Sequence, residues 1–376
     1  MRILHICNSY ADNLLYSNLT NGLSKLNISQ IIFIPIRSRT KLKEFSNCNK
    51  NLDIYKSDTI NLFDRMFFLR KIKKLYKNIS KNIPLADVSL THAHNLFSDG
   101  ALALKLKKDK NIKYIVAVRN TDINIFFKFL FFYRSLGVKI LKEAERIILI
   151  SPAYLEKLLK YIPVEIQDEL KDKISIIPNG VDDFWLDNKE IVTKEKRKFM
   201  NLLYVGDFST NKNIISSIKA VEQLNLEYHN IKLTIIGGGH NSRHLLRYIK
   251  RCDKNIIDLI NRIDDKYELL DYYRQMDIFI MPSFHETFGL VYLEAMTQGL
   301  PIIYTKGQGV DGYFKENSPG YSVNPYSIDD IKNKIILTIE NIQQLSANSL
   351  KHVGNFSWDI ISNKYAELYK KHDNIN

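Results

Sequence analysis

Short apolar runs alternate with segments of helical periodicity along the whole chain. The runs are rich in Ile and Val and apolar on both faces, as in parallel strands buried between two layers of helices. We predict strands at RILHIC (2–7), QIIFIPI (30–36), SLTHAH (89–94), YIVAV (114–118), RIILIS (146–151), LLYVG (202–206), KLTIIGG (232–238), IFIMPS (278–283) and PIIYT (301–305). We predict helices at 137–146, 152–161, 212–225, 268–276 and 288–298.

This alternation falls into two sets, and a chain of 376 residues is long for one domain. We therefore predict an α/β protein with two doubly wound, Rossmann-like domains facing across a cleft, the default ligand site of such folds. The first domain is expected at 1–180 and the second at 190–356. Between them, IIPNGVDDFWLDNKEIVTKEKRK (176–198) has the composition of a linker. Residues 357–376 have helical apolar spacing, and we expect this helix to cross back to the first domain.

Composition excludes several classes of protein. Apolar residues make up 45% and charged residues 25%, as in a soluble globular protein. Three cysteines without paired spacing argue against a disulfide framework or a zinc site, which indicates a reducing cytoplasm. The N-terminus has no signal-peptide core, and no run is long enough to span a bilayer.

The net charge of +13 is unevenly distributed. Residues 1–190 carry 31 Lys and Arg against 20 Asp and Glu, whereas residues 191–376 carry 23 against 21. A basic first half indicates an anionic partner, which leaves nucleic acid, an anionic membrane and a phosphorylated substrate open.

Two carboxylates stand out in the mostly apolar segment PSFHETFGLVYLEAMTQGLPII (282–303). Glu286 lies in the expected loop, and Glu294 lies more than a turn inside the expected helix. The helix start near Gly289 exposes backbone N–H groups, and a residue without a side chain lets a phosphate approach closely. A buried Glu294 needs hydrogen bonds, which two ribose hydroxyls would supply. A capping Glu286 and a backbone-bonded Glu294 fit the spacing equally well.

The sequence ETFGLVYLEAMTQGLPII resembles the signature of the retaining family-4 nucleotide-sugar glycosyltransferases, which have the GT-B fold. The similarity extends over most of the C-terminal half, through IIPNGVD (176–182), LLYVGDFSTNKN (202–213), LTIIGGG (233–239) and DYYRQMDIFIMPSFHETFG (271–289). The resemblance implies that Glu286 contacts the donor sugar and Glu294 the ribose. It also implies that the backbone of Phe288, Gly289 and Leu290 holds the diphosphate.

A second motif, VGDFSTNKN, follows the strand that ends at Gly206. Lys212 has the spacing of the family's phosphate-binding lysine, and a cation suits a departing diphosphate. A solvated surface lysine is the alternative. Relatives usually have an arginine after the glycine, where this chain has Asp207. Arg119 or Arg243 could replace that cation.

The first half departs further from the family. The loop after the first strand, NSYADNLLYSN (8–18), has no glycine, although its first two residues could donate hydrogen bonds. Arg119 stands where many relatives have a histidine near the reacting sugar. It could bind a phosphate and be oriented by Asp122, or the two could form an ion pair that secures the loop. His94 could contact the acceptor. With His92 it could bind a metal only if a third ligand existed.

Two further features concern the nucleotide and metals. The glycine-rich IIGGGH (235–240) could be a structural turn or a nucleotide contact, and we expect the nucleobase near Arg262–Asp264 by position in the pattern. No D-x-D motif is present. We therefore expect no obligatory metal and no cofactor, the nucleotide-sugar being a substrate.

Two stretches combine aromatic and basic residues: DRMFFLRKIKKLYKNISK (64–81) and INIFFKFLFFYR (123–134). The first suits a helix lying on an anionic membrane, or an amphipathic helix packed on the sheet. No nucleic-acid-binding motif accompanies the charge, so we expect no nucleic-acid partner.

The resemblance implies a glycosyltransferase that moves a sugar from a nucleoside diphosphate donor to a hydroxyl with retention of configuration. We expect the donor to be a UDP-sugar and the acceptor a saccharide or lipid-linked saccharide. We expect a role in surface polysaccharide synthesis, in the cytoplasm or peripherally on the membrane. Glu286, Lys212 and Arg119 are the expected catalytic residues, and no protein nucleophile is evident. A non-catalytic sugar-nucleotide-binding subunit and a sugar-nucleotide epimerase are the alternatives.

Overall fold

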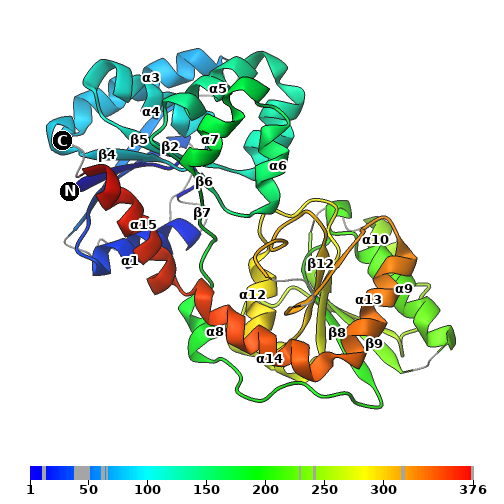
Figure 1. Cartoon of the computed structure of the whole chain (residues 1–376). Helices are drawn as coiled ribbons and strands as arrows, with labels where there is room; N and C mark the ends of the chain where they lie inside the picture. Colours follow the sequence, from blue (N-terminus) through cyan, green and yellow to red (C-terminus); the bar gives the residue numbers. More distant parts are fainter. Residues whose placement is uncertain are drawn as a thin grey trace. The chain divides into compact units, whose positions relative to one another are not determined.

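Two parallel sheets, one in each of two units, organise the chain (Figure 1). The structure is a computed structural model, and it describes residues 1–10, 14–37, 51–60, 64, 67–227, 230–239, 243–314 and 318–373. The first unit comprises Met1–Ile150, Tyr154–Gly180 and Trp358–Asn376, and the second comprises Ser151–Ala153 and Val181–Ser357. None of the described helices is long and apolar enough to cross a membrane.

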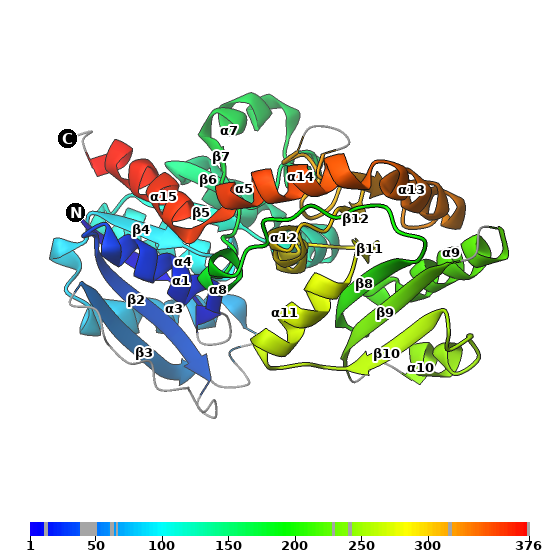
Figure 2. The ribbon, with the colours of Figure 1, turned by 90° about the horizontal axis from the view of Figure 1, so that it is seen from below.

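The first unit contains a seven-stranded sheet with the order β3-β2-β1-β4-β5-β6-β7. Its strands are β1 (Arg2–Ile6), β2 (Ser29–Arg37), β3 (Leu52–Ile60), β4 (Leu90–Ala93), β5 (Tyr114–Val118), β6 (Arg146–Leu149) and β7 (Ile174–Ile176). Its helices are α1 (Leu14–Lys25), α3 (Phe68–Asn82), α4 (Ser98–Lys110), α5 (Arg134–Glu143), α6 (Ala153–Leu159), α7 (Gln167–Lys173) and α15 (Trp358–Asp373). Figure 2 shows β2 and β3 at one edge of this sheet.

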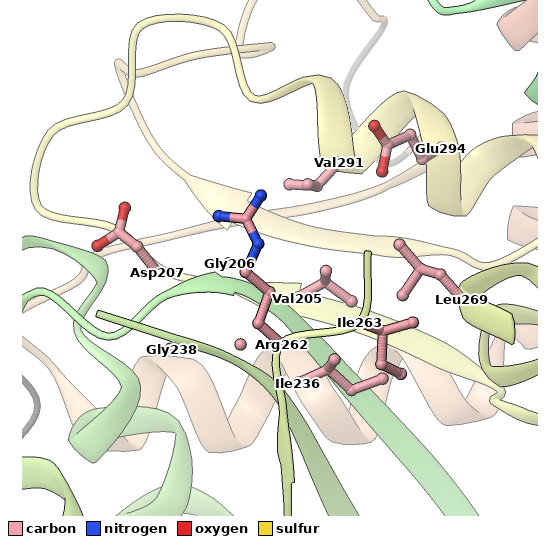
Figure 3. A pocket seen from close by; sticks show the side chains of 11 residues that line it. Val205, Gly206, Asp207, Ile236, Gly238, Arg262, Ile263, Leu269, Val291 and Glu294 are labelled. Carbon is pink, nitrogen blue, oxygen red and sulfur yellow. The ribbon is translucent and has the colours of Figure 1, made fainter. Parts of the chain in front are cut away.

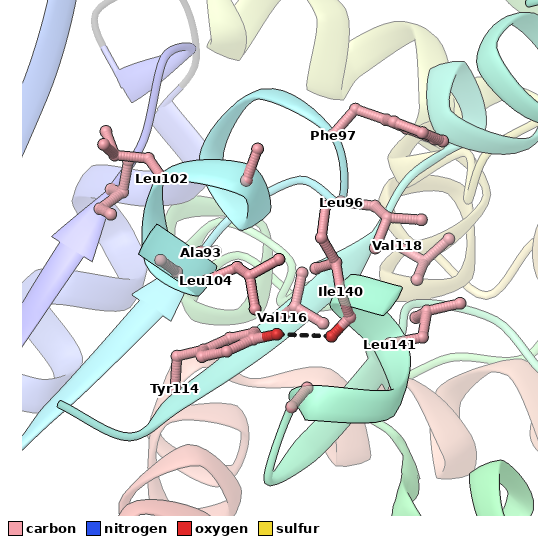
Figure 4. Packing of buried hydrophobic residues seen from close by; sticks show 14 of the residues in the cluster. Ala93, Leu96, Phe97, Leu102, Leu104, Tyr114, Val116, Val118, Ile140 and Leu141 are labelled. Carbon is pink, nitrogen blue, oxygen red and sulfur yellow. Dashed lines mark hydrogen bonds between the residues drawn. The ribbon is translucent and has the colours of Figure 1, made fainter. Parts of the chain in front are cut away.

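The core of this unit forms where α4 and α5 cover β4 and β5. Side chains of β5 such as Val116 and Val118 are fully buried against these helices (Figure 4). The Tyr114 hydroxyl donates to the Ile140 carbonyl at 2.6 Å, which gives a buried polar group of β5 a partner in α5.

Helix α3 packs its apolar side into the same core. Phe68, Ile72, Leu75 and Ile79 are buried there, while Lys73, Lys77 and Lys81 are exposed. The sheet-packed alternative for this basic stretch is therefore right, and its apolar stripe is not available to a membrane. Residues 65–66 of the stretch lie outside the described residues.

Helix α15 packs beside α1, although the two helices come from opposite ends of the chain (Figure 1). Trp358, Ile361, Tyr365 and Tyr369 are buried in a cluster with apolar residues of α1. The last helix therefore contributes to the core of the first unit.

The second unit contains a six-stranded sheet with the order β10-β9-β8-β11-β12-β13. Its strands are β8 (Met200–Asp207), β9 (Ile231–Gly238), β10 (Ile257–Asn261), β11 (Ile278–Met281), β12 (Ile302–Thr305) and β13 (Gly320–Val323). Its helices are α8 (Asp183–Asp187), α9 (Ile214–Glu227), α10 (Arg243–Ile249), α11 (Lys266–Gln275), α12 (Leu290–Thr297), α13 (Ile328–Glu340) and α14 (Ile342–Val353). All described strand pairs in both sheets are parallel, which confirms the prediction of two doubly wound α/β domains.

Every strand predicted from the sequence is present, but four strands were missed: β3, β7, β10 and β13. Each of them is the edge strand of its sheet. The helix predicted at 137–146 is displaced, because α5 ends at Glu143 and Arg146 already begins β6.

The segment 176–198 is not a free linker. The two units divide at Gly180–Val181, and α8 follows at once. Lys194 is buried, its ammonium group donates to the Arg274 carbonyl at 2.7 Å, and its backbone N–H donates to the Ser346 hydroxyl at 2.8 Å. This polar segment is therefore hydrogen-bonded to the second unit and is not a free linker.

The close contact of α1 with α15 yields a stability prediction. A Cβ atom at Gly22 would overlap the Ser362 side chain. We expect Gly22→Ala to destabilise the first unit by about 1–2 kcal/mol, because the overlap outweighs the better helix propensity of alanine. Differential scanning calorimetry measures the change. Gly354→Ala is the control, since nothing lies within 4 Å of its added Cβ, and an unchanged unfolding temperature for Gly22→Ala would contradict the packing.

Candidate functional site

The candidate site lies where the strand order of the second sheet reverses. The order turns around between β8 and β11, which are neighbours in the sheet. In open parallel sheets the loops after two such strands diverge and leave room for a ligand at their carboxyl ends. Here those loops run from Phe208 to Asn213 and from Pro282 to Gly289, and they carry Lys212, Glu286, Phe288 and Gly289 of the residues singled out from the sequence.

Two asparagines tie these loops together. The Asn211 amide donates to the His285 carbonyl at 2.8 Å, and its side-chain oxygen accepts from the His285 N–H at 3.1 Å. The Asn213 amide donates to the carbonyls of Pro282 at 3.1 Å and Pro325 at 2.7 Å. Asn213 has a left-handed backbone (φ 54°), a conformation that asparagine tolerates well. The two loops are therefore held together by hydrogen bonds between asparagine side chains and the backbone, which the sequence alone did not reveal.

Lys212 and Glu286 form an ion pair between the two loops. The ammonium nitrogen lies 2.7 Å from Glu286 Oε2, and only 17% and 11% of the two side chains are exposed. Glu286 Oε1 accepts from the Thr287 N–H at 3.0 Å, and the Glu286 carbonyl accepts from the Gly309 N–H at 3.1 Å. The pair fixes both charged groups in one place, so a ligand that binds Lys212 also lies beside Glu286.

Helix α12 begins directly after this pair. Gly289 caps the helix with a left-handed backbone (φ 83°), and a Cβ there would lie 2.5 Å from the ring of Tyr292. The glycine is thus required by backbone geometry and packing, in addition to the close approach of a phosphate expected from the sequence. Within the described residues, the backbone N–H groups of Phe288, Gly289 and Leu290 donate to no protein acceptor. N–H groups at the positive end of a helix dipole are able to bind an anion, as the sequence resemblance implied for this position.

The side chain of Phe288 serves packing. It is 2% exposed, and its ring lies 5.9 Å from that of Tyr313 and 6.2 Å from that of Phe356. Only its backbone can take part in the site, as the sequence resemblance implied.

A cavity of about 270 Å³ opens beside α12 (Figure 3). It is lined by residues at the ends of β8, β9 and β10 and by α11 and α12: Val205, Gly206, Asp207, Ile236, Gly237, Gly238, Arg262, Ile263, Leu269, Val291 and Glu294. Its size is just below the range of about 300–1,000 Å³ that is typical of small-molecule sites. Five of these eleven residues have apolar side chains and three are glycines, and Glu294 supplies an acidic group at one side.

A hydrogen bond from a buried tyrosine fixes the position of the Glu294 carboxylate. Tyr273, fully buried in α11, donates its hydroxyl to Glu294 Oε2 at 3.2 Å. Burial raises the pKa of Glu294 to about 7, and the hydrogen bond from Tyr273 opposes this shift. Further hydrogen-bond donors, such as two vicinal hydroxyls of a ligand, would stabilise the ionised carboxylate and lower this pKa.

Charged and glycine residues at the strand ends complete the cavity. Asp207 is exposed, and its carboxylate caps the following turn by accepting from the Ser209 N–H at 2.9 Å. The Arg262 guanidinium, which is paired with Asp264 at 2.7 Å, lies between Asp207 and Glu294 in the view of Figure 3. Arg262 is thus the cation that the cavity itself offers, whereas Arg243 is not among the lining residues.

Close packing of two strand ends explains why glycines stand at the end of β9. A Cβ at Gly237 would overlap the Gly206 carbonyl of the neighbouring strand, so the two strand ends can be this close only without side chains. Gly238 also lines the cavity and meets no such obstacle. His240 lies outside the described residues.

In the first unit, Arg119 and Asp122 do not form the ion pair that was one of the two alternatives left open by the sequence. The Asp122 carboxylate accepts from the backbone N–H groups of Leu96 (3.0 Å), Phe97 (3.3 Å) and Arg119 (2.8 Å), and burial raises its pKa to about 6. The Arg119 guanidinium instead donates to the His94 carbonyl at 3.1 Å and lies over the ring of Tyr16. Asp122 therefore holds the backbone of Arg119.

The histidines of β1 and β4 form a buried cluster. His5 lies opposite His92 in the sheet and supplies the third potential ligand that was missing from the sequence reading. His5 Nδ1 and His94 Nε2 are hydrogen-bonded at 3.0 Å, and the rings of His92 and His94 lie 3.9 Å apart. Burial lowers the pKa of all three, so they are neutral. Each of the three buried rings offers a nitrogen, and these nitrogens lie within 4.8 Å of one another, so the cluster could hold a metal ion. Because His94 is buried, it is not exposed to an acceptor.

Comparison with known proteins identifies the family. Residues 16–183 match the family model "Glycosyltransferase Family 4", and residues 183–351 match "Glycosyl transferases group 1". Together these models span both units and almost the whole chain. The chain belongs to the family-4 glycosyltransferases. The sequence resemblance is thereby confirmed.

Individual relatives of this glycosyltransferase are distant. An uncharacterized glycosyltransferase of Methanocaldococcus jannaschii is 26% identical over 82% of this chain and 82% of its own length. The lipopolysaccharide 1,2-N-acetylglucosaminetransferase of Salmonella typhimurium is 26% identical over 52% of this chain and 56% of its own length.

Solved structures establish the fold of the glycosyltransferase. The sucrose-phosphate synthase of Thermosynechococcus elongatus has a TM-score of 0.75 at 18% identity, with 99% of this chain and 98% of that chain covered. HepE of Anabaena, solved in complex with UDP, has a TM-score of 0.73 at 14% identity, with 99% and 100% covered. The fold is therefore GT-B.

The raised pKa of Glu294 yields a prediction that does not depend on any ligand. A carboxyl group that is neutral in the folded state stabilises it fully below the unfolded pKa of about 4.5, and this contribution is lost as pH rises through about 7. We therefore expect Glu294→Gln to gain stability relative to the wild type between pH 5 and pH 8, by about 2 kcal/mol after allowance for partial exposure.

Thermal unfolding at a series of pH values measures this gain. Glu268→Gln, at an exposed position of the adjacent helix α11, is the matched control. A difference between Glu294→Gln and the wild type that stays constant from pH 5 to pH 8 would show that Glu294 is ionised in the folded protein.

Proposed function

We propose that this glycosyltransferase transfers a sugar from a UDP-sugar to a hydroxyl of a saccharide or lipid-linked saccharide, with retention of configuration. The observation that carries the proposal is the arrangement at the strand reversal of the second unit. There a cavity with a carboxylate, a helix start with free N–H groups and a buried Lys–Glu pair follow one another along α12 and its loop. The groups match the order ribose, diphosphate, sugar in a nucleotide-sugar.

The nucleoside end of the donor fits the cavity beside α12. Glu294 would accept hydrogen bonds from the two ribose hydroxyls, which replace the water that burial has removed. The apolar walls around Ile263 and Leu269 suit the flat face of a base, and Arg262 lies at the same end. The HepE complex with UDP supports a uridine nucleotide.

The diphosphate would bind where α12 begins. The N–H groups of Phe288, Gly289 and Leu290 offer hydrogen bonds, and the helix dipole adds positive charge. Lys212 is the cation next to them. When the bond between sugar and diphosphate breaks, negative charge grows on the leaving phosphate, and these fixed donors stabilise it without reorganisation.

Glu286 has two tasks in this proposal. Its carboxylate holds the ammonium group of Lys212 in place, and its position after the helix start puts it beside the donor sugar. A carboxylate there can bind sugar hydroxyls and discriminate between donor sugars. We propose no covalent intermediate on the protein and no resident metal or cofactor, because positioning and charge stabilisation are supplied by Lys212 and α12.

The acceptor would bind the first unit, at the carboxyl ends of its strands. Arg119 lies at the end of β5, with its backbone fixed by Asp122, and could bind an acceptor phosphate. Relatives named for lipopolysaccharide and capsular polysaccharide synthesis support an acceptor in a surface polysaccharide. We propose that the enzyme reaches this acceptor at the cytoplasmic face of a membrane.

The first test is donor binding. In a thermal-shift screen of nucleotides and nucleotide-sugars, we expect stabilisation by UDP and by one or more UDP-sugars. Glu294→Ala should weaken UDP binding by about tenfold, because it removes two hydrogen bonds to the ribose. Glu286→Ala should leave UDP affinity in place and reduce the preference among UDP-sugars. Unchanged binding in both variants would overturn the site.

The second test is turnover with the selected donor and a panel of saccharide acceptors, the anomeric configuration of the product being read by NMR. We expect Lys212→Met to lower the rate by about a hundredfold or more, since it removes the cation at the leaving group. Lys219→Met, at an exposed position of α9, is the matched control. Donor binding without turnover would favour a regulatory subunit, and donor conversion without an acceptor would favour an epimerase.

A further inference from the structure

The first unit exposes a group of large apolar side chains that the core does not use. They are Phe67 (55% exposed), Leu69 (71%), Phe129 (65%), Phe131 (69%) and Phe132 (60%), and we call them the phenylalanine face. Apolar side chains exposed singly are common, but five of this size on two neighbouring segments are not. Such a patch is typical of an interaction surface.

Ring contacts show that the two segments are joined. The ring of Phe68, between Phe67 and Leu69, lies 4.9 Å from that of Tyr133, and Tyr133 lies 4.5 Å from Phe132. Phe131 continues the series at 5.8 Å from Phe132. The start of α3 and the segment before α5 are therefore packed against each other.

The same surface is anchored in the core behind it. The ring of Phe126 stacks on that of the fully buried Phe97 at 4.4 Å, and Phe127 is fully buried. The Arg134 guanidinium donates to the Phe127 carbonyl at 2.6 Å, which fixes the chain on the far side of the exposed rings. The exposed phenylalanines are thus attached to a part of the chain that is packed in the core.

The surroundings of the phenylalanine face are strongly basic. Residues 65–86 contain seven Lys and Arg and no Asp or Glu, and residues 123–142 contain four Lys and Arg and no Asp or Glu. The Lys128 ammonium lies 5.2 Å from the ring centre of Phe129, and the Arg70 side chain is 61% exposed although it lies 3.6 Å from the buried carboxylate of Asp64. Apolar rings among cations match the boundary of an anionic bilayer, where rings enter the acyl region and cations meet headgroups.

We propose that the phenylalanine face docks this glycosyltransferase onto an anionic lipid surface. The apolar stripe of α3, which the sequence offered for that role, is buried, so the inserted groups are Phe129, Phe131, Phe132 and the residues at the start of α3. The idea that a lipid-linked acceptor is met there rests on the proposed function. Lipid binding itself does not, and it is measured without donor or acceptor.

The positive charge around the phenylalanine face favours anionic lipid over a second copy of the chain as its partner. A symmetric dimer through this face would bring the same basic segments of two copies together, and like charges oppose such an interface. An anionic lipid surface has no such penalty. Its attraction weakens as salt is added, whereas apolar burial alone is not screened.

Vesicle co-sedimentation tests the proposal on the whole chain. We compare vesicles of phosphatidylcholine alone with vesicles that also contain phosphatidylglycerol, at low and high salt. The wild type should bind the anionic vesicles at least about tenfold more strongly, and salt should weaken the binding. The variant Phe129→Ser/Phe131→Ser/Phe132→Ser should bind them about tenfold less or worse, because the inserted rings are lost.

Phe199→Ser is the matched control, since Phe199 is 59% exposed but belongs to the second unit. It should bind vesicles as the wild type does. The triple variant should keep the unfolding temperature and the UDP-induced thermal shift of the wild type, because the replaced side chains are exposed and lie outside the donor site. Lys212→Met should keep vesicle binding, which separates this proposal from the catalytic one.

Three results would overturn the proposal. Equal binding to both kinds of vesicle would exclude anionic recognition, and unchanged binding of the triple variant would place the contact elsewhere. A concentration-dependent dimer in analytical ultracentrifugation that the triple variant abolishes would show that the face pairs two copies of the chain.

Discussion

The ion pair between Lys212 and Glu286 depends on the parallel order of the second sheet. The two residues are 74 positions apart in the chain, and they meet because β8 and β11 are neighbours whose carboxyl ends lie at the same edge. Asn211 and Asn213 bond the two loops together, and the left-handed backbone at Gly289 then turns the chain into α12. Each group of the site has its place only through this reversal of strand order.

Much of the fold followed from the sequence because buried parallel strands are apolar on both faces. The strands that were missed lie at sheet edges, where one side faces water and the apolar signal is weaker. β3, for example, reads LDIYKSDTI, with charged residues among the apolar ones. The stretch 176–198 was misread for a related reason, since its polar side chains and backbone bond to the second unit.

The site was predicted less completely than the fold. Glu286, Lys212 and Glu294 could be found because acids and a lysine at fixed spacing are unusual in an apolar segment and resemble a known signature. Their partners could not, because Tyr273 and the two asparagines meet them only in three dimensions. Asp122 shows the same limit: its charge was visible in the sequence, but its three backbone hydrogen bonds were not.

The central claim is that one donor molecule spans α12, from Glu294 through the helix start to Glu286. A crystal structure of the protein with UDP and a non-transferable UDP-sugar tests it most directly. The claim predicts ribose hydroxyls within hydrogen-bonding distance of the Glu294 carboxylate and phosphate oxygens on the N–H groups of Phe288–Leu290 and on Lys212. A nucleotide bound away from α12, or one whose ribose faces Glu286, would contradict it.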